Sequence, residues 1–200
     1  DISSASFFIV AALILKNSEI KIPNININKY RTGIITVLKK MGANISIINK
    51  RFDSNEEIGD LIIKSSQLKP LNIGGEIIST LIDELPILFI ACAVSSGISK
   101  ISGIEELRYK ESDRIKSMEE GLNAVGIKTT STIDSIEING GEILGGKINS
   151  YGDHRIAMAF AIAALISKKS ITIIDTKNIS TSFPNFIDLM REQRADIYEV

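Results

Sequence analysis

The sequence predicts an α/β domain built from three copies of one unit, with apolar helices buried between sheets. Three stretches share one order, an apolar helix, a short polar turn and a β-branched strand, at intervals of roughly 80 and roughly 72 residues. The chain has 200 residues, of which 44% are hydrophobic, enough for a sizeable core. Helices and strands repeated in this way indicate a layered α/β architecture.

The first helix of each unit is expected to be buried, because its residues are apolar nearly all round, as residues 157–166 show most clearly. A buried position for all three would place them at the centre of the domain. The sequence predicts these helices at 3–15, 84–94 and 153–166, and the strands that follow them at 19–22, 98–101 and 170–174.

The second helix of each unit is amphipathic in the first two copies, so it should cover the outside of the domain. Gly42 and Gly126 are the expected C-caps of those two copies. With a strand leading into each first helix, the unit is βαβαββ. The second helices are expected at 32–40, 112–124 and 186–194, and the alternating strand pairs at 45–49 with 60–64 and at 127–130 with 135–138.

We expect a single domain over residues 1–200, with repeat units at 1–66, 67–141 and 142–200. The first unit lacks its leading strand, and Asp1 leads directly into a helix start without an initiator Met. The last unit has only residues 196–200 left for a closing strand. We therefore expect a fragment of a longer protein; the alternative is a complete chain with an unusual register.

Composition narrows the class of function. The net charge of −1 gives no support for nucleic-acid or membrane binding. The single cysteine, Cys92, lies in an apolar run and is expected to be a buried hydrophobe, which excludes an internal disulfide framework and a cysteine-rich zinc site. One histidine disfavours other metal sites. We see no transmembrane run and no targeting segment, so a soluble cytoplasmic protein is the default expectation.

Two helix starts, at residues 108–114 and 152–155, place an arginine in the first turn. A helix N-terminus carries about half a positive charge and disfavours cations by about 0.3–1 kcal/mol per group. Arg114 and Arg155 therefore predict a strongly anionic ligand, such as a phosphate or carboxylate, held by helix N–H groups and arginine forks. The alternatives are a solvated Lys-Glu-Arg surface network at the first start and an ion pair of Arg155 with a neighbour at the second.

The first of these starts combines a cap with closely spaced charges. Ser112 or Asp113 is a good N-cap. Lys110 and Arg114 lie four residues apart across this cap, and Glu111 lies between them in the sequence, where it could be held ionised or exchange a proton.

At the second start Asp153 is the expected cap, and the very apolar helix behind it should hold His154 and Arg155 at a buried end. His154 could equally be a structural, hydrogen-bonding histidine. The segment 83–86 precedes another buried helix, and its acids suit a first turn. In the functional alternative Asp83 faces the same anion site and handles a proton.

Asp83 occupies the place in the repeat that Asp153 occupies in the third unit and Ser3 and Ser4 occupy in the first. If the units are pseudosymmetric, these helix starts converge at one end of the domain. The chain has no P-loop and no GxGxxG fingerprint.

Five runs of residues stand out along the chain. They are Leu-Arg-Tyr-Lys-Glu-Ser-Asp-Arg-Ile at 107–115, Gly-Asp-His-Arg-Ile-Ala-Met at 152–158, Asp-Glu-Leu-Pro at 83–86, Asp-Ile-Ser-Ser-Ala-Ser-Phe-Phe at 1–8 and Ser-Phe-Pro at 182–184. In these runs, which span the whole chain in family order and at family spacing, the sequence resembles the enolpyruvylshikimate-phosphate synthase family. The related UDP-N-acetylglucosamine enolpyruvyl transferases share the fold, but the first two runs favour the shikimate enzymes.

The resemblance implies an enolpyruvyl-transferase-type fold and a shikimate-pathway reaction that leads toward aromatic amino acids. The enolpyruvyl group of phosphoenolpyruvate moves to the 5-hydroxyl of shikimate 3-phosphate, and phosphate is released. No metal or organic cofactor is implied. Family members have two similar domains that close on substrate. This chain resembles the C-terminal, phosphoenolpyruvate-binding domain, without the other domain that holds much of the shikimate-phosphate site.

The resemblance also implies roles for individual residues. Arg114 and Arg155 would hold the phosphate and carboxylate of phosphoenolpyruvate. Lys110 would sit between the two substrates and offset their charge. Asp83 would take the proton from the attacking hydroxyl, and Glu111 would protonate the methylene carbon.

His154 would support Glu111 or the phosphate. The chain departs from the family pattern at two positions. Thr181 stands where many members have a lysine, so the third anion contact would have to come from Lys177. Glu106 stands where some members have an asparagine that contacts shikimate phosphate. We carry neither contact over.

Two rival functions remain open at this point. A UDP-sugar enolpyruvyl transferase would usually need a reactive cysteine in a loop, whereas Cys92 is expected in a helix. A non-catalytic anion-binding module is the second rival. This chain alone is expected to have negligible turnover, because catalysis needs both walls of the cleft to position the acceptor and exclude water.

Overall fold

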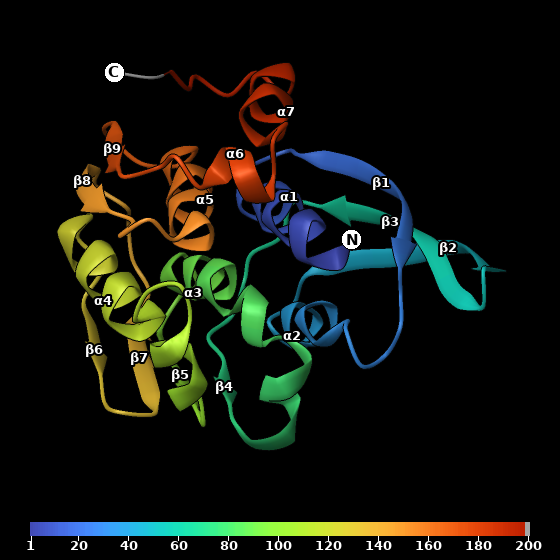
Figure 1. Ribbon diagram of the computed structural model, residues 1–200, viewed down its shortest axis with the longest axis horizontal. Coiled ribbons are helices and arrows are strands. Elements are labelled where there is room, and N and C mark those ends of the chain that lie inside the picture. The colour runs from blue at the N-terminus through green and yellow to red at the C-terminus, as the bar shows by residue number, and fades with distance from the viewer. Residues whose placement is uncertain (199–200) are drawn as a thin grey trace.

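The computed structural model describes residues 1–198 and has the predicted α/β fold class (Figure 1). The middle part of the chain contains the complete βαβαββ order. Its elements are β4 (Asn72–Ile73), the 3-10 turns η1 (Gly75–Thr80) and η2 (Ile82–Glu84), α3 (Leu85–Ala93), β5 (Ile98–Ser102), the 3-10 turn η3 (Glu105–Tyr109), α4 (Arg114–Ala124), β6 (Thr129–Ser131) and β7 (Ser135–Asn139).

The parts before and after follow the same order without some of its elements. The predicted closing strand at 196–200 is described only as far as residue 198, and residues 196–198 form no strand. The first part contains α1 (Ile2–Ile14), β1 (Glu19–Asn26), α2 (Gly33–Lys40), β2 (Asn44–Asp53) and β3 (Glu56–Lys64). The last part contains β8 (Gly146–Asn149), α5 (His154–Ala164), β9 (Ile171–Ile174), α6 (Ile179–Ser182) and α7 (Phe186–Glu192).

The strand order repeats as well. The first sheet is antiparallel with the order β1-β3-β2, and β5-β7-β6 of the second sheet has the same antiparallel order. The second sheet adds β4 parallel to β5, and the third sheet pairs β8 parallel to β9. Within the described residues β1 has no strand on the edge where β4 lies beside β5.

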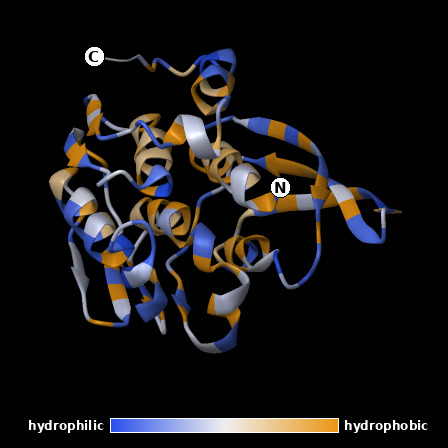
Figure 2. Cartoon of the chain, viewed as in Figure 1, coloured by the Kyte–Doolittle hydropathy of each residue, from blue (hydrophilic) through white to orange (hydrophobic). Residues whose placement is uncertain are grey.

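The first helices α1, α3 and α5 contact one another at the centre, with the sheets around them, as the sequence predicts (Figure 1). Every residue of α3 is buried, and the central helices are largely hydrophobic (Figure 2). Burial of this apolar surface is the main stabilising contribution to the fold. None of the helices in the described part of the chain is both long and apolar enough to span a membrane.

The second helices end where the sequence predicts. Gly42 and Gly126 follow α2 and α4 with φ of +91° and +92°, a conformation that glycine adopts without strain. Gly121 of α4 lies against the ring of Phe160 in α5, where a Cβ atom would come within 2.3 Å of the ring. This close approach brings α4 and α5 side by side and places their N-termini next to each other.

The β2–β3 hairpin is longer than predicted, and both strands that flank β3 contain an irregularity in their pairing with it. At these points Asn24 and Asn49 adopt φ of +57° and +52°. Asp60 of β3 accepts hydrogen bonds from the backbone N–H of Asn24 and from Asn49 Nδ2, at 3.1 and 2.9 Å, and pairs with Lys21 Nζ at 2.9 Å. We call Lys21, Asn24, Asn49 and Asp60 the hairpin cluster.

Candidate functional site

Several helix starts converge at one end of the domain, as the repeat predicts. Ser3 Oγ in α1 donates to Glu84 just before α3. Arg155 Nη1 in α5 donates to the backbone oxygen of Asp83 at 3.0 Å. Arg114 Nε at the start of α4 donates to the Asp153 carboxylate, the N-cap of α5, at 2.8 Å. Segments far apart in the sequence therefore form one polar cluster.

We call a set of ionisable residues in this region the helix-start cluster. It contains all the candidate residues that the sequence predicts. They are Asp83, Lys110, Glu111, Arg114, His154 and Arg155, together with Asp153.

Arg114 is the buried centre of this cluster, with its side chain only 1% exposed. Besides Asp153, which is 0% exposed, it pairs with Glu111 at 2.5 Å and with Asp83 at 3.5 Å. The position of Arg114 at a helix start therefore does not by itself require an external anion, and the Glu111 pair belongs to the Lys-Glu-Arg network that the sequence left open. Acids of the chain itself compensate its charge, and the buried Asp153 explains how a cation can lie at this helix start.

Asp83 is the point on which the cations converge. Its carboxylate lies 3.7 Å from Lys110 Nζ, 3.5 Å from Arg114 Nη1 and 3.9 Å from Arg155 Nη2, and it is 40% exposed. A half-exposed carboxylate among three cations lies where an external anion would also be attracted. The cations of the helix-start cluster thus have an internal anion among them.

Lys110 pairs mainly with Glu106, at 2.6 Å. The hydrogen bond to Glu106 raises the pKa of Lys110, partial burial opposes this shift, and the charge of Asp83 adds to it. The lysine is therefore held in its charged form. Glu106, one of the two positions that depart from the family pattern, anchors this lysine.

A hollow of about 290 Å³ opens between the starts of α1 and α5. Its polar lining consists of Asp1, Ser3, Ser4, His154, Arg155 and Ser182, and its apolar lining consists of Phe7, Met158 and Phe183. Its size and polarity suit a small anionic molecule bound at helix N-termini.

Burial lowers the pKa of His154, and the positive charge of Arg155 adds to the shift, while Asp153 and Glu111 oppose it. The imidazole is therefore neutral near pH 7, able to donate or accept one hydrogen bond at the hollow. Arg155 keeps its side chain 16% exposed and has looser ion pairing than Arg114. Of these two arginines, Arg155 is the one available to a ligand in the hollow.

The caps refine the predicted correspondence between units. Asp153 caps α5 by accepting from the Arg155 N–H at 2.9 Å, and Asp113, rather than Ser112, caps α4. In α3 the N-cap position is held by Glu84 and not by Asp83, because a 3-10 turn, Ile82–Glu84, precedes the helix. Asp83 is therefore displaced by one residue from the place of Asp153.

Glu84 is the functional candidate that the sequence did not single out. It is 4% exposed and bonded to Ser3, which lines the hollow. Burial raises the pKa of Glu84, the hydrogen bond from Ser3 and the charges of Arg155 and Arg31 oppose the shift, and Asp83 adds to it. Its only signal in the sequence was its position, directly after Asp83 and two residues before the proline in the first turn of α3.

The segment around α6 contributes to the hollow through Ser182 and Phe183. Thr181 is exposed in α6, and Lys177 is not among the described residues that line the hollow. The structure therefore gives no support for Lys177 as a substitute for the family lysine at this place.

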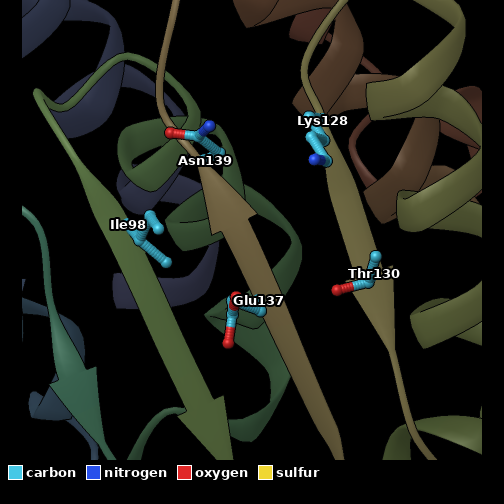
Figure 3. A pocket seen from close by; sticks show the side chains of 5 residues that line it. All are labelled: Ile98, Lys128, Thr130, Glu137 and Asn139. Carbon is cyan, nitrogen blue, oxygen red and sulfur yellow. The ribbon is translucent and has the colours of Figure 1, made fainter.

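A smaller hollow of about 90 Å³ lies on the second sheet (Figure 3) and shares no lining residue with the hollow at the helix starts. It is lined by Ile98 of β5, Glu137 and Asn139 of β7, Thr130 of β6 and the adjoining Lys128. Its two charged residues, Glu137 and Lys128, have opposite charges. This surface lacks the converging cations and helix N-termini of the first hollow, so we assign the site to the helix starts.

Within residues 1–198 no group of three or more His, Cys, Asp or Glu side chains could hold a metal ion. Cys92 lies in α3 and is fully buried, and burial raises the pKa of its thiol to about 12. The thiol is therefore the buried hydrophobe that the sequence predicts, and not a reactive nucleophile.

Comparison with known proteins identifies the family to which the chain is similar. Residues 1–190 match the family described as EPSP synthase (3-phosphoshikimate 1-carboxyvinyltransferase). The chain is 49% identical over 187 residues to the 3-phosphoshikimate 1-carboxyvinyltransferase of Legionella pneumophila (strain Paris), and 48% identical over 197 residues to that of Petrotoga mobilis. These alignments cover 94% and 98% of this chain but only 43% and 46% of the relatives.

Solved structures give the same picture. An EPSP synthase from Acinetobacter baumannii superposes with a TM-score of 0.93 at 43% identity, over 98% of this chain and 45% of that one. The enolpyruvyl transferase NikO from Streptomyces tendae superposes with a TM-score of 0.79 at 17% identity, over 100% of this chain and 44% of that one, which indicates a shared fold. The chain spans less than half the length of each.

Proposed function

The chain belongs to the EPSP synthase family, and on that basis we propose that it forms the phosphoenolpyruvate-binding half of an enolpyruvyl transferase. The reaction would transfer the enolpyruvyl group of phosphoenolpyruvate to the 5-hydroxyl of shikimate 3-phosphate and release phosphate. The observation that carries the proposal is the convergence of Asp83, Lys110, Arg114 and Arg155 beside a hollow at the helix starts.

Phosphoenolpyruvate carries a phosphate and a carboxylate, and the hollow offers matching donors. Arg155 at the start of α5 and the side chains of Ser3 and Ser4 at the start of α1 line the hollow and would donate to one anionic group of the ligand. Neutral His154 adds a single hydrogen bond. For Arg114 to reach the ligand, it has to exchange its bonds with Asp83 or Glu111 for bonds to the ligand, while Asp153 keeps it in place.

Two carboxylates are suited to the proton transfers. In the addition step, the acceptor hydroxyl attacks C2 of phosphoenolpyruvate while its methylene carbon gains a proton. Elimination then removes that proton and phosphate. We assign Asp83 as the base for the hydroxyl and Glu111 as the acid for the carbon, because both are half exposed and lie beside the cations. Lys110 would offset the charge of the two substrates.

We propose further that residues 1–200 are one domain that acts with a second domain. Support comes from the relatives, which are more than twice as long, and from the edge of β1. That edge corresponds to the place of β4 beside β5, so an extended segment parallel to β1 would complete the first sheet. The second domain would supply the opposite wall of the cleft and most contacts to shikimate 3-phosphate.

The test is phosphate release from phosphoenolpyruvate plus shikimate 3-phosphate by this chain mixed with the remaining part of a full-length relative. We expect release that needs both polypeptides, with negligible turnover by either alone, because one wall cannot position the acceptor. Asp83→Asn should abolish release, whereas Lys21→Ala in the hairpin cluster should not. No release from a folded, associated mixture, or ready turnover by this chain alone, would contradict the proposal.

A further inference from the structure

We propose that Glu84 is a positioning residue that takes up a proton when an anion binds in the hollow, which turns the Ser3 hydroxyl into a donor toward that anion. This inference rests on the proposed function, because it concerns the same hollow. It adds a group that contacts no substrate and acts through Ser3.

The geometry places Glu84 behind the wall of the hollow. Its side chain lies at the N-cap position of α3, and the residue is 4% exposed. It does not cap the helix, and its Oε1 instead accepts from Ser3 Oγ in the first turn of α1. Ser3 lines the hollow together with Ser4 and Arg155. Glu84 is therefore linked to the hollow through the Ser3 hydroxyl.

A serine hydroxyl has a single proton to donate. While Ser3 donates that proton to an ionised Glu84, the hydroxyl presents only lone pairs to the hollow, and these repel an anion. If Glu84 binds a proton from solvent, its carboxylic O–H donates to Ser3 Oγ instead. The Ser3 proton is then free to point at the ligand, so one proton taken up by Glu84 gives one new hydrogen bond to the anion.

The surroundings favour this coupling. Burial already disfavours the charged form of Glu84, and the opposing influences are the Ser3 hydrogen bond and the charges of Arg155 and Arg31. An anion in the hollow would pair with Arg155, so the positive charge of Arg155 would stabilise ionised Glu84 less. The anion would also add its own negative charge nearby. Both changes raise the proton affinity of Glu84 further.

The effect of Glu84 on pH-dependent anion binding must be distinguished from that of the other titratable groups near the hollow. Asp83 adjoins Glu84 in the chain and raises its pKa, while Asp1 and His154 line the hollow. His154 also titrates, and a protonated imidazole would attract an anion as well. Variants of Glu84 and of His154 therefore have to be compared at the same pH values.

The experiment is a calorimetric titration of this chain with sulfate between about pH 5 and about pH 8, where this probe keeps one charge state. We expect the wild-type affinity to rise as the pH falls, by up to about tenfold per pH unit for one linked proton. Glu84→Gln, whose amide donates to Ser3 permanently, should bind tightly with little pH dependence. Ser3→Ala should bind weakly with little pH dependence.

His154→Gln is the matched control and should keep the pH dependence of the wild type. Loss of the dependence in His154→Gln, with the dependence retained in Glu84→Gln, would overturn the inference. Sulfate and phosphoenolpyruvate binding without any pH dependence in the wild type would overturn the inference and leave the proposed function standing. Absence of binding of either anion by both the wild type and Glu84→Gln would overturn both.

Discussion

The hairpin cluster and the helix-start cluster both take charged side chains out of water, but they do so differently. In the hairpin cluster one buried carboxylate, Asp60, accepts from groups within a single sheet, and its only cation, Lys21, is half exposed. In the helix-start cluster the buried pair Arg114–Asp153 joins two helix N-termini and lies beside half-exposed charges and a hollow.

The difference teaches how the two kinds of polar cluster can be told apart. Asp60 fixes two irregular strands, and its hydrogen bonds account for its position completely. Arg114 and Arg155 lie where helix dipoles disfavour cations. Such an arrangement costs stability unless acids or a ligand compensate it, which is why the internal acids and the adjoining hollow occur together.

The largest effect on stability is expected from Asp153→Ala. It leaves the guanidinium of Arg114 buried without its closest carboxylate, and breaking a buried ion pair costs about 3–5 kcal/mol. Urea unfolding measures this loss. Asp113→Ala is the matched control: it removes the N-cap of α4 and the ion pair with Arg108, but Arg108 is 18% exposed and keeps its hydrogen bonds to backbone oxygens. Loss of the cap should cost about 1 kcal/mol. Equal losses in the two variants would contradict the central position of Arg114.

Asp60→Asn should also destabilise the domain, by less than Asp153→Ala and without changing anion affinity. Hydrogen bonds from Asn49, Lys21 and the backbone of Asn24 hold the pKa of Asp60 well below its usual range. A lowered pKa stabilises the folded state above the usual aspartate pKa, and this contribution is lost as the pH falls through the folded-state value. The melting temperature of Asp60→Asn should therefore be lower than that of the wild type at pH 7, and the difference should disappear at acidic pH.

Asp83→Asn should raise the affinity of this chain for phosphoenolpyruvate several-fold, although it should abolish turnover in the reconstituted mixture. The Asp83 carboxylate occupies the cations that an external anion would use, so its neutralisation removes an internal competitor. Calorimetric titration measures the affinity. An affinity equal to or below that of the wild type would show that Asp83 does not compete with the ligand.

The smallest effect is expected from Glu84→Gln on the stability of the empty domain. The raised pKa of Glu84 means that its contribution to folding is favourable below the usual glutamate pKa and is lost as the pH rises through the folded-state value. The amide should thus raise the melting temperature slightly at pH 8, and the gain should vanish toward pH 4. A lower melting temperature at pH 8 would indicate that ionised Glu84 stabilises the fold.

Much of this architecture could be predicted from the sequence, because periodicity and caps are local signals. The apolar run of α5 and the glycines after α2 and α4 gave elements within a few residues of their observed ends. The pairing of Arg114 with Asp153 could not be predicted in the same way. Asp153 lies 39 residues away in the sequence, and only the packing of α4 on α5 brings the pair together.

Other features could not be predicted from the sequence for similar reasons. The irregular pairing at Asn24 and Asn49 involves hydrogen bonds to Asp60 of a third strand, so no local pattern in the sequence indicated it. Glu84 resembled an ordinary first-turn acid, and its role depends on Ser3 from another helix. For the candidate site, the sequence offered the charged residues and left open whether ion pairs within the chain or an external anion compensate them. Only the tertiary structure shows that Asp153 and Asp83 are internal partners of Arg114.

Titration of phosphoenolpyruvate into Arg155→Ala and Lys21→Ala tests most directly whether the two clusters serve different purposes. Each variant removes one cation near a carboxylate, in the helix-start cluster and in the hairpin cluster respectively. We expect Arg155→Ala to lose at least about tenfold in affinity for phosphoenolpyruvate, roughly 1.4 kcal/mol, while the unliganded domain keeps its stability. Lys21→Ala should bind phosphoenolpyruvate as the wild type does. Wild-type affinity in Arg155→Ala, or a strongly destabilised empty domain, would contradict a ligand-binding role for the helix starts.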